Sequence, residues 1–360
     1  MRTVLVTGAS RYIGARVAAR LAHDPAVDRV IGVDTSADVD PDVAVARDMP
    51  GVLAGVEFVR ADLRATEIAA LIADARVDTV VHLAVVTSPE AVGGRAAMKE
   101  LNVIGTMQLL AACQQAPSVR KLVVRSSTAA YGASFRDPAV FTEDTEPREI
   151  PRGGFARDIL DIEDYVRGFC RRRPDVITTM LRFAPFVGRH ADTSLTRYFS
   201  QPVVPTVLGR DPRLQFVHAD DALEVLHRSV TEDHPGTYNV AGPGVLLLSQ
   251  AIRRAGRVGV PVPEFGLSAA ATLVPGFSHD QVDLFVHGRV VDISRLVAEY
   301  GFAPRPTAEA FDDFARFHRQ SAPLAPDRVA AAEATVRDSI RLLRLGGQWA
   351  HRRVTRGREG

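Results

Sequence analysis

The chain of 360 residues contains little cysteine and little lysine. Its 2 cysteines, Cys113 and Cys170, are too few and too far apart for a disulfide framework or a zinc site. We therefore predict no metal site and a reducing, cytoplasmic location. Lys99 and Lys121 are the only lysines, so few positions could hold a lysine with a chemical role.

The sequence also lacks a strong net charge and a long hydrophobic run. A formal charge of +1, without a cluster of aromatic and basic residues, predicts no nucleic-acid partner. The longest apolar stretch, from about Phe265 to Phe277, is interrupted by Pro275 and is shorter than the ~20 residues of a spanning helix. We expect no membrane span, and the absence of a charged-then-apolar leader also favours the cytoplasm.

Short apolar runs alternate with amphipathic segments through the first half of the chain. The predicted strands are Val4–Val6, Val30–Val33, Val56–Val59, Thr79–Leu83, Lys121–Arg125 and Ile177–Phe183. The predicted helices are about Ile13–Ala22, Met98–Gln115 and Ala156–Arg173. This alternation predicts an α/β fold with a parallel sheet covered on both faces, and right-handed crossovers make it a Rossmann-type doubly wound sheet.

Composition changes twice in the second half of the chain. From Pro185 onward proline and glycine become frequent, which suggests a change of domain. We predict a nucleotide-binding domain over residues 1–184, which segments returning from the second half complete. A smaller C-terminal substrate lobe follows over residues 185–320. Residues 321–360 combine an apolar helical repeat with an arginine-rich end. We interpret them as an amphipathic helix on the body with a basic tail, the alternative being a peripheral contact with a membrane or acidic partner.

The first apolar strand runs into a glycine-bearing turn, Thr7-Gly8-Ala9-Ser10-Arg11-Tyr12-Ile13-Gly14. Gly8 allows the tight turn, and Gly14 lets the following helix pack close to the strand. The helix start offers unpaired N–H groups and a positive dipole end to a pyrophosphate. The usual middle glycine is missing, because Arg11 and Tyr12 fill those positions. The predicted dinucleotide contacts in the turn are Gly8, Ser10, Arg11, Tyr12, Ile13 and Gly14.

Asp34 ends the second strand, twenty residues after Gly14. A carboxylate at this place accepts hydrogen bonds from ribose hydroxyls and repels a 2′-phosphate, which favours NAD over NADP. Arg11 leaves NADP open as the alternative, since its guanidinium could pair with a 2′-phosphate. Further predicted cofactor contacts follow the third and fourth strands, at Asp62, Leu63, Leu83, Ala84 and Val85.

These motifs, in this order, resemble the extended short-chain dehydrogenase/reductases, and within them the NAD-dependent epimerase/dehydratases that include UDP-glucose 4-epimerase-like proteins. The resemblance covers about residues 1 to 318 and also rests on Asn102–Thr106, Ser126–Gly132, Phe141–Asp144, Leu181–Phe183, Phe216–Ala222 and Tyr238–Val240. It implies NAD, a sugar or nucleotide-sugar substrate, and a homodimer formed by the helices near 98–115 and 156–173. It adds Asn102 to the cofactor contacts and Thr87 to the substrate contacts.

The chain departs from that family where proton transfer takes place. The family's serine, four residues before a Tyr-Gly pair, corresponds to Ser127 and would hydrogen-bond the reacting oxygen. Its acid/base tyrosine and the lysine four residues later correspond to Phe155 and Ile159, neither of which can transfer a proton. No tyrosine elsewhere in the sequence has a lysine four residues on.

The substrate side departs as well. Pro185 replaces an asparagine that touches the nucleotide sugar in the family, and Leu214 replaces an arginine that meets the diphosphate. Arg210 and Arg213 lie close in the sequence and are predicted substrate contacts.

Substitute catalytic residues can be named from the sequence. Ser127, Thr128 and Asp158 are the candidates, because an aspartate in a partly dry cleft can have a raised pKa. We favour the alternative that Asp158 only caps and solvates the start of its helix. For His218 we favour a packed, hydrogen-bonded histidine. Two functions remain: an NAD-binding epimerase/dehydratase-like enzyme without the Tyr/Lys pair, and a catalytically inactive NAD-binding sensor, regulatory or scaffolding protein.

Overall fold

The structure, a computed structural model, describes residues 2–35, 54–151, 154–263 and 279–318. Its centre is a seven-stranded sheet in the order β11-β6-β5-β4-β1-β2-β3, with every neighbouring pair parallel. The strands are β1 (Thr3–Thr7), β2 (Arg29–Asp34), β3 (Val56–Arg60), β4 (Thr79–His82), β5 (Lys121–Ser127), β6 (Ile177–Phe183) and β11 (Gly236–Val240). The predicted Rossmann-type fold is confirmed, and the strand order reverses between β1 and β4.

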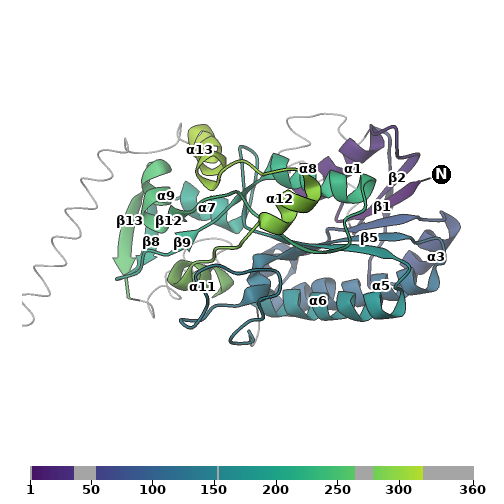
Figure 1. The fold of residues 1–360 in the computed structure, drawn as a ribbon, viewed down its shortest axis with the longest axis horizontal. Helices are drawn as coiled ribbons and strands as arrows, with labels where there is room; N and C mark the ends of the chain where they lie inside the picture. The colour runs from purple at the N-terminus through teal and green to yellow at the C-terminus, as the bar shows by residue number, and fades with distance from the viewer. Residues whose placement is uncertain (1, 36–53, 152–153, 264–278, 319–360) are drawn as a thin grey trace, which may run out of the picture.

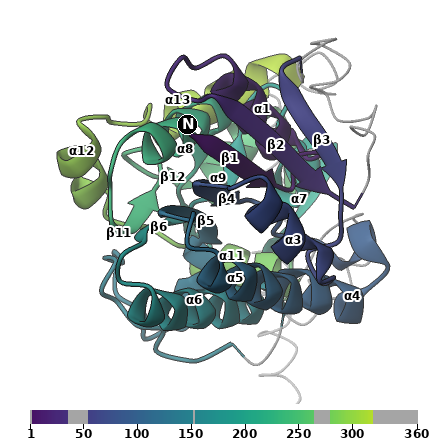
Figure 2. The same ribbon diagram turned by 90° about the vertical axis from the view of Figure 1, so that its right-hand side faces the viewer.

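Helices cover both faces of this sheet (Figures 1 and 2). One face carries α1 (Tyr12–Ala22), α8 (Ala219–Thr231) and α12 (Ser294–Tyr300). The other carries α3 (Glu67–Asp74), which the sequence analysis did not name, α5 (Gly105–Gln115) and α6 (Gly154–Arg172). Strand side chains alternate between the two layers, since Val4 and Val6 join the core beneath α1 while Leu5 joins the core beneath α5 and α6.

The helix predicted from Met98 is longer and is not uniformly α-helical. It begins as α4 (Arg95–Lys99), continues through the π-helical segment η2 (Glu100–Ile104) and becomes α5. Such π segments are often found at functional sites. This one places Asn102 fully inside the protein, beside the loop that follows β4.

A second group of elements packs beyond the carboxyl edge of the sheet, at the left of Figure 1. It comprises α7 (Ser194–Ser200), α9 (Leu248–Arg254), α11 (His279–His287), α13 (Thr307–His318) and the strand pairs β8 (Val203–Val207) with β13 (Val258–Val262), β9 (Arg213–Leu214) with β12 (Leu246–Leu247), and β7 (Phe186–Val187) with β10 (Val217–His218). Its core is aromatic and contains Tyr198, Phe199, Phe216, Phe285 and Phe311.

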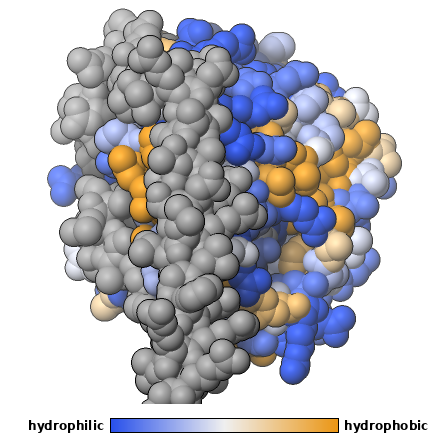
Figure 3. Space-filling view, turned by 90° about the vertical axis from the view of Figure 1, so that its left-hand side faces the viewer, coloured by the Kyte–Doolittle hydropathy of each residue, from blue (hydrophilic) through white to orange (hydrophobic). Residues whose placement is uncertain are grey.

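The outer face of this group shows apolar residues in small groups separated by hydrophilic ones (Figure 3). Among the helices of the described ranges, none has the length and apolar character needed to cross a membrane. The apolar stretch near Phe265–Phe277 and the predicted C-terminal helix with its basic tail lie outside the described residues.

Candidate functional site

The glycine turn between β1 and α1 has the geometry of a phosphate-binding cradle. Gly8 has φ +73°, and a Cβ added to it would lie 2.9 Å from the Ala84 amide nitrogen. A Cβ added to Gly14 would lie only 2.0 Å from the Gly8 carbonyl oxygen. Both positions therefore require glycine, and together they bring the start of α1 against the carboxyl edge of β1 and β4.

The missing middle glycine does not disturb this backbone. Arg11, the residue before α1, has φ −91° and ψ 157°, a conformation open to any side chain. The first turn of α1 contains no acidic residue, and no side chain caps its start. Tyr12 is half-buried and Ile13 is buried at 7 % exposure.

Asp34 lies at the end of β2 and is held against the same turn. Its Oδ2 accepts hydrogen bonds from the Ser10 hydroxyl at 2.5 Å and the Ser10 amide at 3.3 Å. Its Oδ1 accepts from the Thr35 amide at 2.8 Å. The structure thus brings Asp34 and Ser10 together, with the carboxylate half-buried beside the glycine turn.

The residues that follow β3 and β4 line the neighbouring edge. Asp62 is bound by the Arg64 side chain, which holds the pKa of its carboxyl below the ordinary value, and Leu63 is buried. Leu83 and Val85 are buried, whereas Ala84 is half-buried directly beside Gly8.

His82 ties β1, β4 and the π-helical segment together. The Leu83 and Ala84 amides donate to the Thr7 hydroxyl oxygen at 3.2 and 3.3 Å. The hydroxyl proton of Thr7 is then directed to Nδ1 of His82 at 2.8 Å, so Nε2 donates to Thr106 at 2.8 Å. Burial, aided by the nearby charge of Arg125, lowers the pKa of His82 to about 4. This neutral histidine holds the β4 loop rather than facing a ligand.

Asn102 and Asp158, which the sequence offers as a cofactor contact and as a substitute catalytic residue, are buried and bonded to each other. The side-chain oxygen of Asn102 accepts from the Val86 amide at 2.7 Å, and its amide group donates to the Val86 carbonyl at 2.9 Å and to Asp158 at 3.1 Å. The Asp158 carboxylate is fully buried and receives both terminal nitrogens of Arg95, at 2.6 and 2.5 Å. Neither side chain has polar atoms to spare, so Asn102 is a positioning residue. Asp158 is the buried half of an ion pair with Arg95, so it is not the solvated helix-start aspartate that the sequence favours, and its catalytic role stays a prediction.

Ser127, at the end of β5, is the candidate catalytic residue that retains an available hydroxyl. Its Oγ accepts a hydrogen bond from the Ala129 amide at 3.1 Å, which leaves its proton free to donate. Thr128 is buried in the short turn η3 (Thr128–Tyr131) that follows. On the first two turns of α6, Phe155 packs against the apolar core and Ile159 lies fully within it.

A buried ion pair between Glu163 and Arg182 is bonded to β5 through Ser126. Glu163 of α6 is fully buried and accepts from Ser126 at 2.5 Å and from Arg182 at 2.8 and 2.9 Å. Arg182 also donates to the Tyr131 hydroxyl, which in turn donates to Asn239 of β11 at 2.7 Å. Burial raises the pKa of Tyr131 above its ordinary value. This network fixes the strand that carries Ser127 and leaves Tyr131 no role in proton exchange with a ligand.

Arg125 is a residue of the site that the sequence analysis did not select. Its guanidinium lies 5.1 Å from the ring centre of Phe186 and 3.4 Å from the Val85 carbonyl. Burial and the neighbouring charge of Arg11 lower the pKa of Arg125 to about 10. The one sequence signal was a charged residue at the carboxyl end of an otherwise apolar strand, Leu122–Val124.

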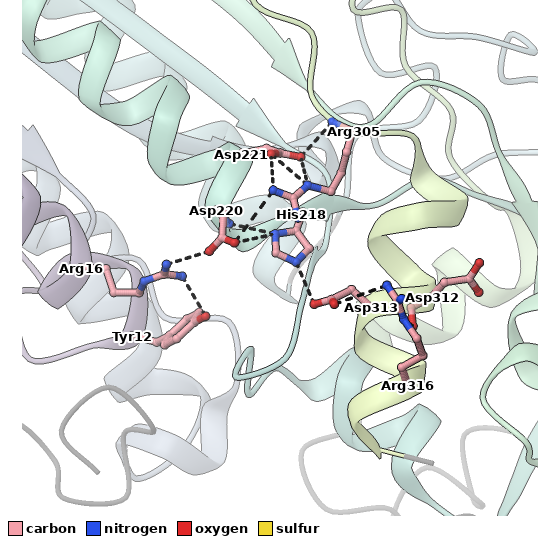
Figure 4. Close-up of polar contacts among 9 residues, drawn as sticks. All are labelled: Tyr12, Arg16, His218, Asp220, Asp221, Arg305, Asp312, Asp313 and Arg316. Carbon is pink, nitrogen blue, oxygen red and sulfur yellow. Dashed lines mark hydrogen bonds and ion pairs between the residues drawn. The ribbon is translucent and has the colours of Figure 1, made fainter. Parts of the chain in front are cut away.

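A chain of polar contacts joins the glycine turn to α13 (Figure 4). Arg16 donates to the Tyr12 hydroxyl at 3.0 Å and pairs with Asp220 at 2.7 Å. The Asp220 amide donates to Nδ1 of His218 at 3.1 Å, and Nε2 of His218 lies 3.3 Å from Asp313. His218 is thus buried and bonded through both ring nitrogens, the packed arrangement that the sequence favours.

The predicted substrate residues Thr87, Arg210 and Arg213 are all exposed in the structure. Thr87 is exposed in the loop after β4. The Arg213 side chain donates to the Ala139 carbonyl at 2.9 Å, and the Arg210 guanidinium lies 4.5 Å from the ring centre of Phe135, which is 65 % exposed. Leu214 is buried in the aromatic core. Within the described ranges, no three His, Cys, Asp or Glu side chains gather as a metal site.

Comparisons with known proteins agree with this geometry. The sequence model of the NAD dependent epimerase/dehydratase family matches residues 4–241. An uncharacterised protein of Mycobacterium tuberculosis is 45 % identical over 357 residues, which cover 98 % of this chain and 92 % of that protein. A Bacillus cereus UDP-glucuronic acid 4-epimerase, solved with UDP-glucuronic acid and NAD, has a TM-score of 0.69 at 18 % identity and covers 88 % of this chain and 99 % of its own. A tyrosine-to-phenylalanine mutant of a B. cereus UDP-glucuronic acid 4-epimerase, solved with a fluorinated substrate analogue and NAD, has a TM-score of 0.67 at 19 % identity, covering 88 and 99 %.

Proposed function

The chain belongs to the NAD-dependent epimerase/dehydratase family, and from this membership we propose that it binds NAD together with a sugar or nucleotide-sugar-like substrate. The observation that carries the proposal is the cradle at Gly8 and Gly14, where a Cβ would collide with backbone atoms. Such an approach of helix to strand leaves the N–H groups of α1 open to a pyrophosphate. Calorimetry should detect NAD binding at micromolar affinity or better, and its absence would refute the proposal.

NAD rather than NADP is the proposed cofactor. The Asp34 carboxylate lies against Ser10, where a 2′-phosphate would meet a like charge. Arg11 lies in the glycine turn itself, which we assign to the pyrophosphate, and its charge lowers the pKa of Arg125 on β5. We expect NADP to bind at least about tenfold more weakly than NAD, since a like-charge contact costs roughly 1.4 kcal/mol or more.

NAD, when bound, supplies hydride transfer. Ser127 is the proposed contact of the reacting oxygen, because its proton is free to be donated. Phe155 and Ile159 provide neither a proton acceptor nor a cation, so the ordinary 4-epimerisation of UDP-sugars should be feeble, about 10²–10⁴-fold below that of an enzyme with a positioned acid/base.

The test is to introduce the missing pair and measure UDP-sugar 4-epimerisation. The double variant Phe155→Tyr/Ile159→Lys should gain activity that Phe155→Tyr alone does not reach, because the phenolate needs a nearby cation. Ser127→Ala in the double variant should remove that gain. Native activity that survives Ser127→Ala would contradict the assignment of the site.

A catalytically inactive NAD-binding sensor or regulatory protein is the second candidate. The observation that favours it is the ion pair of Asp158 with Arg95, which occupies the carboxylate that the sequence offers as a substitute for the tyrosine. This candidate predicts micromolar NAD binding, no turnover of any UDP-sugar, and no effect of Ser127→Ala.

A homodimer formed by α5 and α6 remains part of the proposal. Ile104, the last residue of η2 just before α5, and Tyr165, in the middle of α6, are each 37 % exposed. Light scattering should give twice the chain's mass of 39.0 kDa, and Tyr165→Glu should reduce it.

A further inference from the structure

Arg125 is a cation without a countercharge at the carboxyl edge of the sheet. Among the residues that the structure describes, no carboxylate lies within ion-pair distance of it. Its surroundings are a carbonyl oxygen, that of Val85, and the face of the Phe186 ring. A partly buried guanidinium in such surroundings would gain from an anion or from an electron-rich group and would disfavour a second cation.

The position of Arg125 relates to one particular half of the proposed dinucleotide. In a doubly wound sheet the two ends of a dinucleotide bind on either side of the point where strand order reverses. Asp34 on β2 marks the adenosine side, and the Gly8 turn marks the pyrophosphate. Arg125 lies on the other side, between the loop after β4 and β7, and two residues before Ser127 on the same strand. In the proposed complex, that side would receive the nicotinamide.

The oxidised and reduced cofactors differ in charge only at this ring. The nicotinamide of NAD⁺ carries a positive charge, the dihydronicotinamide of NADH carries none, and the pyrophosphate is the same in both. A fixed positive charge beside the ring therefore acts on the difference between the two forms. Resting on the proposed NAD binding, we infer that Arg125 makes this site prefer the reduced cofactor, NADH, over NAD⁺.

Arg11 provides the matched comparison. It lies in the glycine turn, and its side chain makes no hydrogen bond or ion pair with another described residue. Both arginines are cationic and neighbouring, but Arg11 belongs to the pyrophosphate end, whose charge does not change on reduction. Removing Arg11 should weaken NAD⁺ and NADH by the same factor, whereas removing Arg125 should change their ratio.

The experiment measures dissociation constants for NADH, NAD⁺ and ADP-ribose by calorimetry at one ionic strength and pH 8. The native protein should bind NADH about tenfold more tightly than NAD⁺, the effect of one nearby charge in a partly buried site. Arg125→Met, which keeps the aliphatic stem against Phe186, should bring the two constants together by tightening NAD⁺. Arg125→Lys should keep the preference, and ADP-ribose, which has no nicotinamide, should bind Arg125→Met as it binds the native protein.

Three results would overturn the inference. If the native protein binds NAD⁺ as tightly as NADH or more tightly, that result by itself refutes the inference. This measurement does not depend on the folding of any variant. Loss of ADP-ribose affinity in Arg125→Met, with the NADH to NAD⁺ ratio preserved, would assign Arg125 to the pyrophosphate instead. Binding of neither cofactor form by the folded native protein would refute the proposed function as well. An Arg11→Met variant that weakens both forms equally completes the support.

Discussion

Acid should weaken this protein through one buried histidine. The pKa of His82 falls from 6.5 to about 4 on folding, chiefly because burial disfavours the charged ring. Between pH 6.5 and pH 4 the His82 ring is protonated in the unfolded chain but neutral in the native state. The free energy of unfolding therefore decreases as the pH is lowered from 6.5 to 4. The hydrogen bonds agree with this sign, since the Thr7 hydroxyl needs an unprotonated Nδ1 as its acceptor.

The magnitude follows from the size of the shift. One pKa unit corresponds to 1.36 kcal/mol, so the full displacement of the His82 pKa is worth about 3 kcal/mol, of which about 2 kcal/mol is lost between pH 7 and pH 5. His82→Asn retains a polar group near Thr7 but cannot titrate. The variant should be less stable than the native protein at pH 7, and the difference between them should shrink by about 2 kcal/mol at pH 5.

Urea denaturation followed by fluorescence at the two pH values measures this directly. All other titrating groups are present in both proteins, so their contributions cancel in the comparison. If the difference in stability between native and His82→Asn is the same at pH 5 as at pH 7, then His82 is not a neutral, buried group in the native state.

Further predictions concern the cradle and the ion pair beside it. Gly14→Ala should abolish NAD binding and lower the melting temperature, because its Cβ would lie 2.0 Å from the Gly8 carbonyl oxygen, and calorimetry and thermal denaturation test this. Gly105→Ala is the matched control and should be neutral or stabilising, since its Cβ would lie at an ordinary 3.4 Å from its nearest neighbour. Arg95→Met should cost about 3–5 kcal/mol in urea denaturation by stranding the buried Asp158 carboxylate, and a loss below about 1 kcal/mol would contradict the pairing.

The sheet could be predicted because buried parallel strands are continuous apolar runs. The strand predicted at Ile177–Phe183 has those bounds in the structure, and the other predicted strands differ by one or two residues at one or both ends. The cradle was predictable for a related reason, since Gly8 and Gly14 lie in one local strand-turn-helix segment. The chemistry of a turn is contained within its own few residues.

The rest of the site depends on side chains brought together from distant segments. Arg95 and Asp158 are 63 residues apart in the sequence, and only the packing of the η2 segment, which follows α4, against α6 determines that they pair. Asn102 carries a motif that resembles a cofactor contact, yet the π-helical segment turns it inward. In the sequence Arg125 is only the charged end of a strand, because its neighbours Val85 and Phe186 come from distant segments.

The position of β11 in the sequence has a consequence for folding during synthesis. β6 ends at Phe183, but β11, the strand that pairs with its free edge, begins only at Gly236. The edge of β6 therefore stays unpaired while about fifty more residues are synthesised, which takes about 3 to 10 s at typical synthesis rates. An unpaired parallel edge invites pairing with other chains. During this interval the half-made protein would need a chaperone or a sheltering ribosome surface. A chain whose synthesis stops before Val240 should aggregate, because the edge of β6 has no strand to pair with.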